Sequence, residues 1–201
     1  MTKEGDILKI VREDILRTLG EEETEEVSVD SIKSDINVSD PFISKAIKQL
    51  NGEGLIKYHN NFISLTERGK ENARDIVKKH RILENYVKET KNGRDAHKVA
   101  HILEHYVSKE VIDNIKKLST LKSAGVPLTE LECNGKGIIT DIVFSDYGVF
   151  ERMVSMGIFL GERIRITNEI SDSIVVKIGN KKIALNKDIA ENIRIYKNER
   201  T

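Results

Sequence analysis

The chain has 201 residues and balances 33 lysines and arginines against 33 aspartates and glutamates, so its formal net charge at pH 7 is zero. This balance excludes a protein that holds nucleic acid by bulk charge alone, although local basic patches stay possible. One cysteine excludes a disulfide framework and a thiolate-rich metal cluster. Because no apolar run approaches the ~18–20 residues of a membrane span or forms a signal-peptide core, we expect a soluble, cytoplasmic protein.

Residues 1–75 show the pattern of a winged helix-turn-helix domain. Apolar residues at helical spacing predict a first helix over 4–20, and two short helices follow, one capped by Asp30 and one opening at Pro41. Two β-rich runs, LIKYH and FISLT, then flank a pair of asparagines, which is a typical hairpin signal. Three helices and a hairpin in this order predict a DNA-binding domain.

The helix that opens at Pro41 carries the candidate DNA contacts, because its polar face and N-terminal end would meet the major groove and the phosphates. These candidates are Ser39, Pro41, Phe42, Ser44, Lys45 and Lys48. Phe42 has two open interpretations, contact with a thymine methyl group or packing against the wing. Residues 1–75 hold 16 acidic but only 11 basic side chains, so their cations would have to gather on the DNA face.

Residues 76–122 are predicted to be helical and to carry metal chemistry. Four of the five histidines fall between residues 80 and 105. His80 and Glu84 are four residues apart and share a helix face. The next helix, expected over about 95–107, aligns four candidate ligands on one stripe: His97, His101, Glu104 and His105. Imidazole and carboxylate are ligands of divalent transition metals. A lone histidine is more often a core or surface residue, but several buried together without a cation would leave polar groups unsatisfied.

The spacing of this stripe indicates two metal sites. His97 and His105 are about 12 Å apart along a helix axis at ~1.5 Å per residue, and ligand bonds of ~2 Å cannot easily join both to one ion. One site would therefore contain His80, Glu84 and His97. The other would contain His101, Glu104 and His105, with Asp14 of the first helix as a candidate further donor. Without thiolate, both sites suit iron(II), manganese(II), cobalt, nickel or zinc.

The same residues allow one enzymatic interpretation. His101-Ile-Leu-Glu104-His105 satisfies the inverted zinc-protease pattern, with Glu104 as general base. That enzyme needs a third ligand from a distant helix, and the chain beyond residue 118 contains no histidine. We therefore expect a metal-binding regulator and not an enzyme.

Residues 123–201 are predicted to form a linker and a small β-barrel. The runs GIITDIV, GERIRIT, SIVVKIG and KKIALN recur at roughly ten-residue spacing, which is typical of short barrel strands. The expected fold class is a multidomain α+β protein with a winged helix, a helical domain and this barrel.

The chain resembles the diphtheria toxin repressor family of iron- and manganese-dependent regulators in its long form. The resemblance rests on VSDPFISKAIKQLNGEGLIKYHNNFISLTERGKENA, KKHRILENYV and AHKVAHILEHYVSKEV. At the C-terminal end, MGIFLGERIRI and IALNKDIAENIRI resemble the small FeoA-like barrel of the longer members. The resemblance to this family implies a winged-helix domain over 1–75, a helical metal-binding and dimerisation domain over 76–122, and a linker with an FeoA-like domain over 123–201.

The resemblance also implies the division of the metal ligands. The family's ancillary site falls on His80, Glu84 and His97, and its primary site falls on Asp14, His101, Glu104 and His105. The sequence departs from the family at His101, where Cys or Glu is usual, and at Arg17, where manganese-type members have a second carboxylate. A ligand from the barrel would fall on Asp146, but the second such position is the apolar Val149, and Asp146 has the alternative role of a loop residue.

The expected function is that of a transcriptional repressor with a divalent metal as corepressor, iron(II) before manganese(II), in two sites per chain. Its partners would be a second copy of the chain and a palindromic DNA operator. The alternatives are a manganese-responsive regulator of the same family, a winged-helix regulator with purely structural metals and, remotely, the metallohydrolase. Eight apolar residues are candidates for the dimer face or the monomer core: Val99, Ile102, Leu103, Tyr106, Val107, Val111, Ile112 and Ile115.

Overall fold

The computed structural model describes residues 3–22, 24, 26–36, 38–90, 96–121, 125–144 and 146–197. Contacts divide the chain into two compact units, Met1–Arg81 and Ile82–Thr201. Of the linker expected over residues 123–127, Ser123 and Ala124 lie outside the described residues, whereas Val126 and Pro127 form a short strand. Within the described part of the chain, no helix is both long and apolar enough to cross a membrane.

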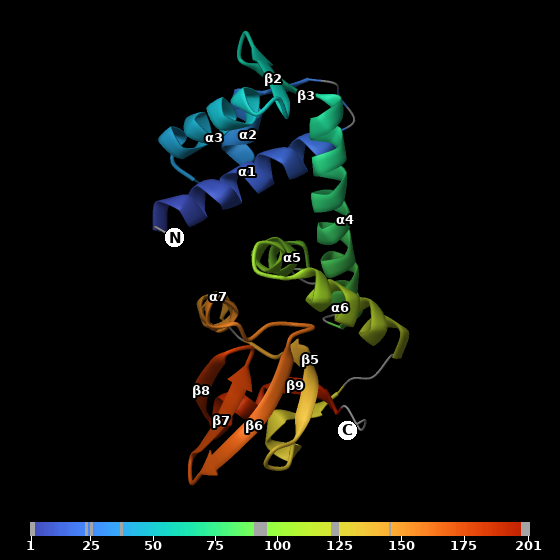
Figure 1. Cartoon of the computed structure of the whole chain (residues 1–201), viewed down its shortest axis with the longest axis vertical. Coiled ribbons are helices and arrows are strands. Elements are labelled where there is room, and N and C mark those ends of the chain that lie inside the picture. Colours follow the sequence, from blue (N-terminus) through green and yellow to red (C-terminus); the bar gives the residue numbers. More distant parts are fainter. Residues whose placement is uncertain are drawn as a thin grey trace. The chain divides into compact units, whose positions relative to one another are not determined.

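The first unit is a winged helix-turn-helix, as the sequence predicts (Figure 1). Its elements are α1 (Lys3–Glu21), β1 (Val27–Ser28), α2 (Val29–Asp35), α3 (Asp40–Gly52), β2 (Ile56–His59), β3 (Phe62–Leu65) and the first part of α4 (Glu67–Thr90). The three strands form an antiparallel sheet in the order β1-β3-β2. Asn60 and Asn61, which connect β2 to β3, both have positive φ, 47° and 66°. A two-residue hairpin turn of type I′ requires positive φ at both of these positions.

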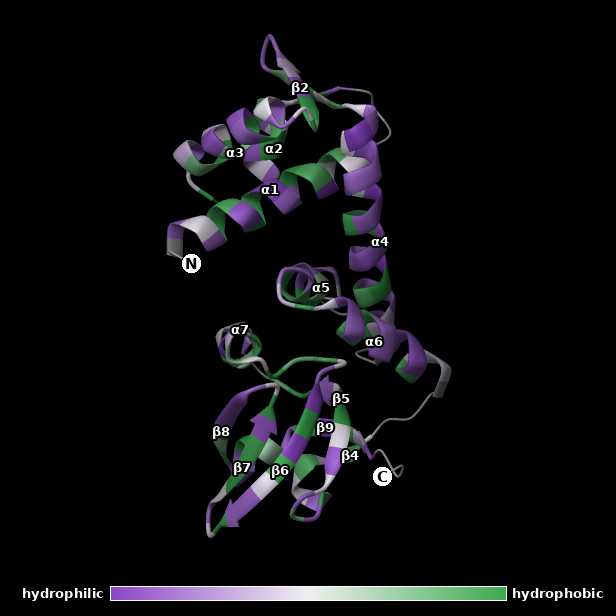
Figure 2. Ribbon diagram, viewed as in Figure 1, coloured by the Kyte–Doolittle hydropathy of each residue, from purple (hydrophilic) through white to green (hydrophobic). Residues whose placement is uncertain are grey.

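The core of this unit is apolar and lies between α1, α3 and the sheet. Val11 and Ile15 of α1, Ile43 and Leu50 of α3, and Ile63 of β3 are fully buried in one cluster. Figure 2 shows how hydrophobic and hydrophilic residues alternate along these helices, as expected for elements that bury a single face. This packing fixes α3 in place and leaves its opposite face exposed.

Helix α4 begins where the chain passes close to its own backbone. The hydroxyl of Thr66 accepts a hydrogen bond from the N–H of Gly69 at 3.0 Å and so caps the first turn. A Cβ on Gly69 would lie 1.9 Å from the carbonyl oxygen of Leu55, so only glycine fits. From this start α4 continues without a break as far as Thr90, in the second unit.

The second unit combines helices with a six-stranded antiparallel sheet. Its elements after α4 are α5 (Ala96–Glu104), α6 (Lys109–Leu121), β4 (Val126–Pro127), η1 (Leu128–Glu130), β5 (Lys136–Ile142), α7 (Tyr147–Met156), β6 (Arg163–Ile170), β7 (Ser173–Ile178), β8 (Lys181–Asn186), α8 (Lys187–Glu191) and β9 (Ile193–Lys197). The strand order is β4-β9-β5-β6-β7-β8, with register shifts in the β5–β9 and β6–β7 pairs that bend the sheet (Figure 1). The expected mixed α+β class with a small C-terminal β-domain is confirmed.

Helix α6 and the sheet share one hydrophobic core. Gly161, with φ +80°, lies against α6, where a Cβ would come within 2.7 Å of Ile115 Cγ1. The amide of Asn114 donates to the carbonyl of Gly161 at 2.9 Å, and the hydroxyl of Tyr86 donates to the carbonyl of Thr140 at 2.9 Å. Burial raises the pKa of Tyr86, so its hydroxyl keeps the donated proton.

This shared core contains most of the apolar residues that the sequence assigned either to the monomer core or to a dimer face. Six of the eight are buried in it: Val99, Leu103, Val107, Val111, Ile112 and Ile115. Of the two interpretations that the sequence left open, the monomer core therefore applies to these six, because other residues of the same unit already cover them. Tyr106, at 49% exposure, stays on the surface, and Ile102 is half-buried.

Candidate metal centres and nucleic-acid face

Three of the predicted ligands converge at the end of α5. His101 and Glu104 lie one turn apart on the helix, and His105 follows in the turn where the N–H groups of Tyr106 and Val107 both bond to the carbonyl of Leu103. The Nε2 atoms of His101 and His105 lie 4.0 Å and 3.7 Å from Glu104 Oε1. The helix thus ends earlier than the predicted 107, and this turn brings His105 beside Glu104.

The geometry of these three residues fits a divalent metal ion. Ligand bonds of ~2.0–2.2 Å keep any two ligands of one ion within about 4.4 Å of each other, and both distances to Glu104 satisfy this limit. The Glu104 side chain is 2% exposed and that of His105 is 7% exposed. A carboxylate so far removed from water is costly unless a cation accompanies it, and a bound ion would supply that cation.

A second group lies on α4 and α5. His97 Nδ1 lies 3.7 Å from Glu84 Oε1. His80, which is 1% exposed, precedes Glu84 by one turn of the same continuous helix, and a ligand atom of each lies within 4.8 Å of the other. Lys88 Nζ also lies 2.9 Å from Glu84 Oε1. An ion in this site would therefore compete with a lysine for the carboxylate, a contact that the i,i+4 spacing of Glu84 and Lys88 could have indicated.

The two remaining ligand candidates belong to other elements than α4 and α5. Asp14 lies on α1 in the first unit and is 2% exposed. Asp146 is the N-cap of α7, where its Oδ1 accepts from the N–H of Gly148 at 2.7 Å, and the ligand groups found among the described residues do not include it. Val149 is exposed. The structure gives Asp146 a capping role close to the alternative that the sequence allowed, and we do not retain it as a ligand.

The exposed face of α3 carries most of the candidate DNA contacts. Five of the six are exposed, namely Ser39, Pro41, Ser44, Lys45 and Lys48. Phe42 is half-buried and packs against the core of the first unit, so packing outweighs contact with a base for this residue. Ser39 is the N-cap of α3, but its side chain makes no capping hydrogen bond.

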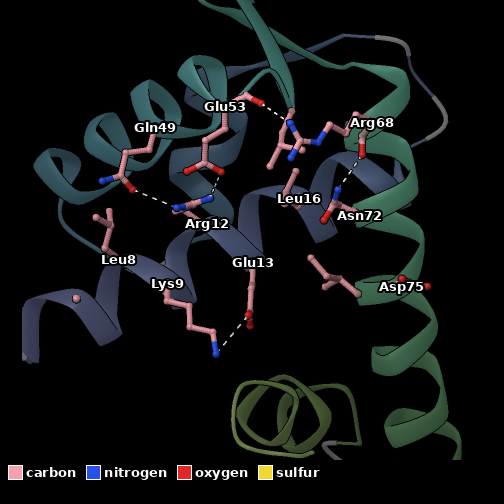
Figure 3. Close-up of a pocket in the computed structure, with 13 residues that line it drawn as sticks. Leu8, Lys9, Arg12, Glu13, Leu16, Gln49, Glu53, Arg68, Asn72 and Asp75 are labelled. Carbon is pink, nitrogen blue, oxygen red and sulfur yellow. Dashed lines mark hydrogen bonds and ion pairs between the residues drawn. The ribbon is translucent and has the colours of Figure 1, made fainter. Parts of the chain in front are cut away.

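Beside α3, a groove of about 580 Å³ lies between α1, α3 and α4 (Figure 3). Ion pairs balance the charges in it, since Arg12 lies 2.5 Å from Glu53 and Lys9 lies 3.8 Å from Glu13. Arg12 also donates to Gln49 at 3.4 Å, so this arginine ties α1 to α3. None of the residues that line the groove belongs to either ligand group. The contacts of Arg12 in the groove hold α1 and α3 together.

Comparison with known families bears on these sites directly. Residues 66–120 match the family model for the metal binding and dimerisation domain of iron dependent repressors, and residues 126–197 match the FeoA domain. Residues 66–120 thus belong to the iron-dependent repressor family. The long form expected from the sequence, with a C-terminal FeoA-like domain, is thereby confirmed, and because the family consists of transcriptional repressors, the chain is not an enzyme.

Solved structures similar to the chain span its whole length or its C-terminal part. One is a manganese-dependent transcriptional repressor in complex with manganese, 22% identical, with 92% of this chain and 99% of that chain covered and a TM-score of 0.47. Another is the IdeR protein of T. acidophilum, 20% identical, with 98% and 99% covered and a TM-score of 0.42. A FeoA-like protein from Clostridium acetobutylicum is 27% identical over 36% of this chain and 86% of its own, with a TM-score of 0.33. Among curated proteins, no match was found.

Proposed function

We propose that this iron-dependent repressor binds a palindromic DNA operator as a cytoplasmic homodimer and uses iron(II) as its corepressor, with manganese(II) as the next candidate. The observation that carries the proposal is the grouping of His101 and His105 around a buried Glu104 carboxylate. Two imidazoles and a carboxylate without thiolate suit these ions, whose softness lies between that of magnesium and copper.

The primary site of the proposal consists of Asp14, His101, Glu104 and His105. The three residues of α5 and its following turn would hold the ion, and Asp14 would add a fourth ligand from the DNA-binding unit. A divalent ion would supply two positive charges, which would offset the Asp14 and Glu104 carboxylates. In this way metal binding links α1 to the helical domain and favours one spacing of the two recognition helices in the dimer.

The ancillary site of the proposal consists of His80, Glu84 and His97. His80 and Glu84 are already placed by one helix, so the site needs only the approach of His97 from α5. Lys88 neutralises Glu84 in the absence of metal and would have to leave that carboxylate when an ion binds. This competition makes the ancillary site the weaker of the two.

Two copies of α3 related by a two-fold axis would read half-sites about one helical turn, ~34–36 Å, apart or at multiples of that distance. Selection from a random DNA pool tests the proposal. The metal-stripped protein is run anaerobically with iron(II), manganese(II), zinc(II) or a chelator. A palindromic site recovered only with metal supports the proposal and ranks the ions. Equal recovery with chelator would reduce the metals to a structural role, and no recovery under any condition would contradict DNA binding.

The contribution of Asp14 has its own test. Asp14→Ala should weaken the metal response of DNA binding while the fold and dimer formation stay intact, as circular dichroism and sedimentation would show. If Asp14→Ala responds to metal as the unaltered protein does, the proposed link between α1 and the ion is wrong.

A further inference from the structure

A lysine on the candidate DNA face is held by an acidic side chain of the same unit. Lys45 Nζ lies 2.8 Å from Glu4 Oε1, and the two side chains are 51% and 62% exposed. Lys45 belongs to the exposed face of α3, whereas Glu4 belongs to the first turn of α1, 41 residues earlier. The ion pair therefore connects α3 to a neighbouring helix, on the face that the proposed function assigns to DNA.

The packing of α1 against α3 keeps Glu4 near Lys45. Further along the two helices, Arg12 joins Glu53 and Gln49, as Figure 3 shows. Apolar residues of both helices are buried in one core. Because both helices are fixed in this way, the N-terminal turn of α1 is presented to α3 by the fold itself and not by the ion pair alone.

The carboxylate of Glu4 is charged when it meets Lys45. The hydrogen bond from Lys45 and the attraction of its charge together hold the pKa of Glu4 below its usual value. A carboxylate and a phosphate present the same kind of acceptor to an ammonium group, namely an anionic oxygen. Lys45 can thus pair with a phosphate only by leaving Glu4 or by sharing its charge between both anions.

We propose that Glu4 is an internal competitor for DNA phosphate, which lowers the affinity of the recognition helix for DNA by holding Lys45. This inference rests on the proposed function as a DNA-binding repressor and deepens it by naming a residue that sets DNA affinity. It also gives one use to the acidic excess of residues 1–75, where 16 acidic side chains accompany 11 basic ones. The acidic residue weakens sequence-independent binding, in which phosphate contacts dominate.

The test compares two substitutions on the same turn of α1 in the full-length, metal-loaded protein. Glu4→Gln removes the partner of Lys45, whereas Asp6→Asn removes an equal charge from the same first turn. Affinity for a mixed-sequence duplex is measured by fluorescence anisotropy from low to moderate salt. We expect Glu4→Gln to bind about two- to fivefold more tightly than Asp6→Asn at low salt, the range of an exposed ion pair, with the advantage shrinking as salt screens the charges.

A Lys45→Ala background makes the test specific. In that background Glu4→Gln and Asp6→Asn should bind DNA equally, because the competitor has no lysine to hold. Equal affinities of the two variants in the original chain, or an advantage of Glu4→Gln that persists with Lys45→Ala, would overturn the inference alone. If the unaltered chain and every variant fail to bind the duplex, the proposed function falls as well.

Discussion

Glu104 is the residue on which the metal chemistry depends, since its buried carboxylate lies beside two imidazoles. Glu104→Gln keeps the size of the side chain but removes the anionic ligand. We expect metal affinity at this site to fall by roughly 100-fold or more, because even outer partners of ligands are worth 10–100-fold. Titration with manganese(II), followed by electron paramagnetic resonance of the free ion, measures the loss. The exposed Glu151→Gln on α7 is the matched control, and equal affinities of the two variants would contradict the assignment.

The carboxyl group of Glu162 should make the thermal stability of the protein depend on pH. Burial raises the pKa of Glu162, and the nearby Glu110 carboxylate acts in the same direction, while the N–H of Arg163 opposes them. The unfolded chain therefore ionises first as pH rises, and stability is lost between the ordinary and the raised pKa. Glu162→Gln should leave the thermal midpoint unchanged at pH values below the ordinary pKa of glutamate and raise it as the pH increases above that pKa. A gain of equal size at every pH would show that charge is not the cause.

The residues themselves show where sequence reasoning succeeded and where it stopped. The spacing of His101, Glu104 and His105 indicated a shared site because helical periodicity is local, and the structure brings these three together. The pair of Glu4 and Lys45 had no such signal, since 41 residues separate its members and only the packing of α1 on α3 joins them.

Among the secondary-structure elements, α2 and α3 each begin after a serine, and the two serines can be compared as helix caps. Ser28 caps α2 by accepting the N–H of Ser31 at 3.1 Å, in place of the expected Asp30, whereas Ser39 at the start of α3 makes no such bond. Ser28→Ala should destabilise the first unit by about 1 kcal/mol, and Ser39→Ala should change stability much less but weaken DNA binding. Urea unfolding and duplex binding measured on both variants check the two effects. The opposite pattern would exclude Ser39 from the DNA face.

Helix α7 is not among the elements predicted from the sequence, although the sequence contains caps and helical spacing that indicate it. Asp146 caps its start, and Gly157 ends it with φ +97°, which is a left-handed C-cap. Its buried residues Phe150, Met153 and Val154 follow helical spacing. These caps and the helical spacing indicate a helix, although the short strands on both sides of the segment favour the expectation of a continuous barrel.

At the scale of the whole molecule, most of the candidate dimer face turned out to be core. Sequence periodicity indicates that a face is apolar, but it does not say whether the same chain or a second copy covers it. Here Ile115 is covered by the loop at Gly161, which lies 46 positions later in the chain. The order of the fold's parts was therefore predictable, and the division between core and interface was not.

Gly161 provides a test of how the sheet packs on α6. An added Cβ at φ +80° would be strained and would lie 2.8 Å from the carbonyl oxygen of Val111. Gly161→Ala should cost about 2–4 kcal/mol of unfolding free energy, from backbone strain and overpacking together. Gly179 has φ +54° with nothing near its missing Cβ, so Gly179→Ala shows the strain alone. Equal losses in urea denaturation of the two variants would mean that α6 and the sheet do not pack closely at this point.

The proposed function requires that metal and DNA bind to this protein in a coupled way, and the affinity for an operator measured with and without metal reports this coupling. Fluorescence anisotropy with a selected operator would be run anaerobically in iron(II), in manganese(II) and in chelator. Coupling of 1–3 kcal/mol, the usual size for linked sites, predicts about 5- to 150-fold tighter binding with metal. Metal affinity should rise by the same factor when DNA is present. Identical DNA affinity in metal and in chelator would contradict the account.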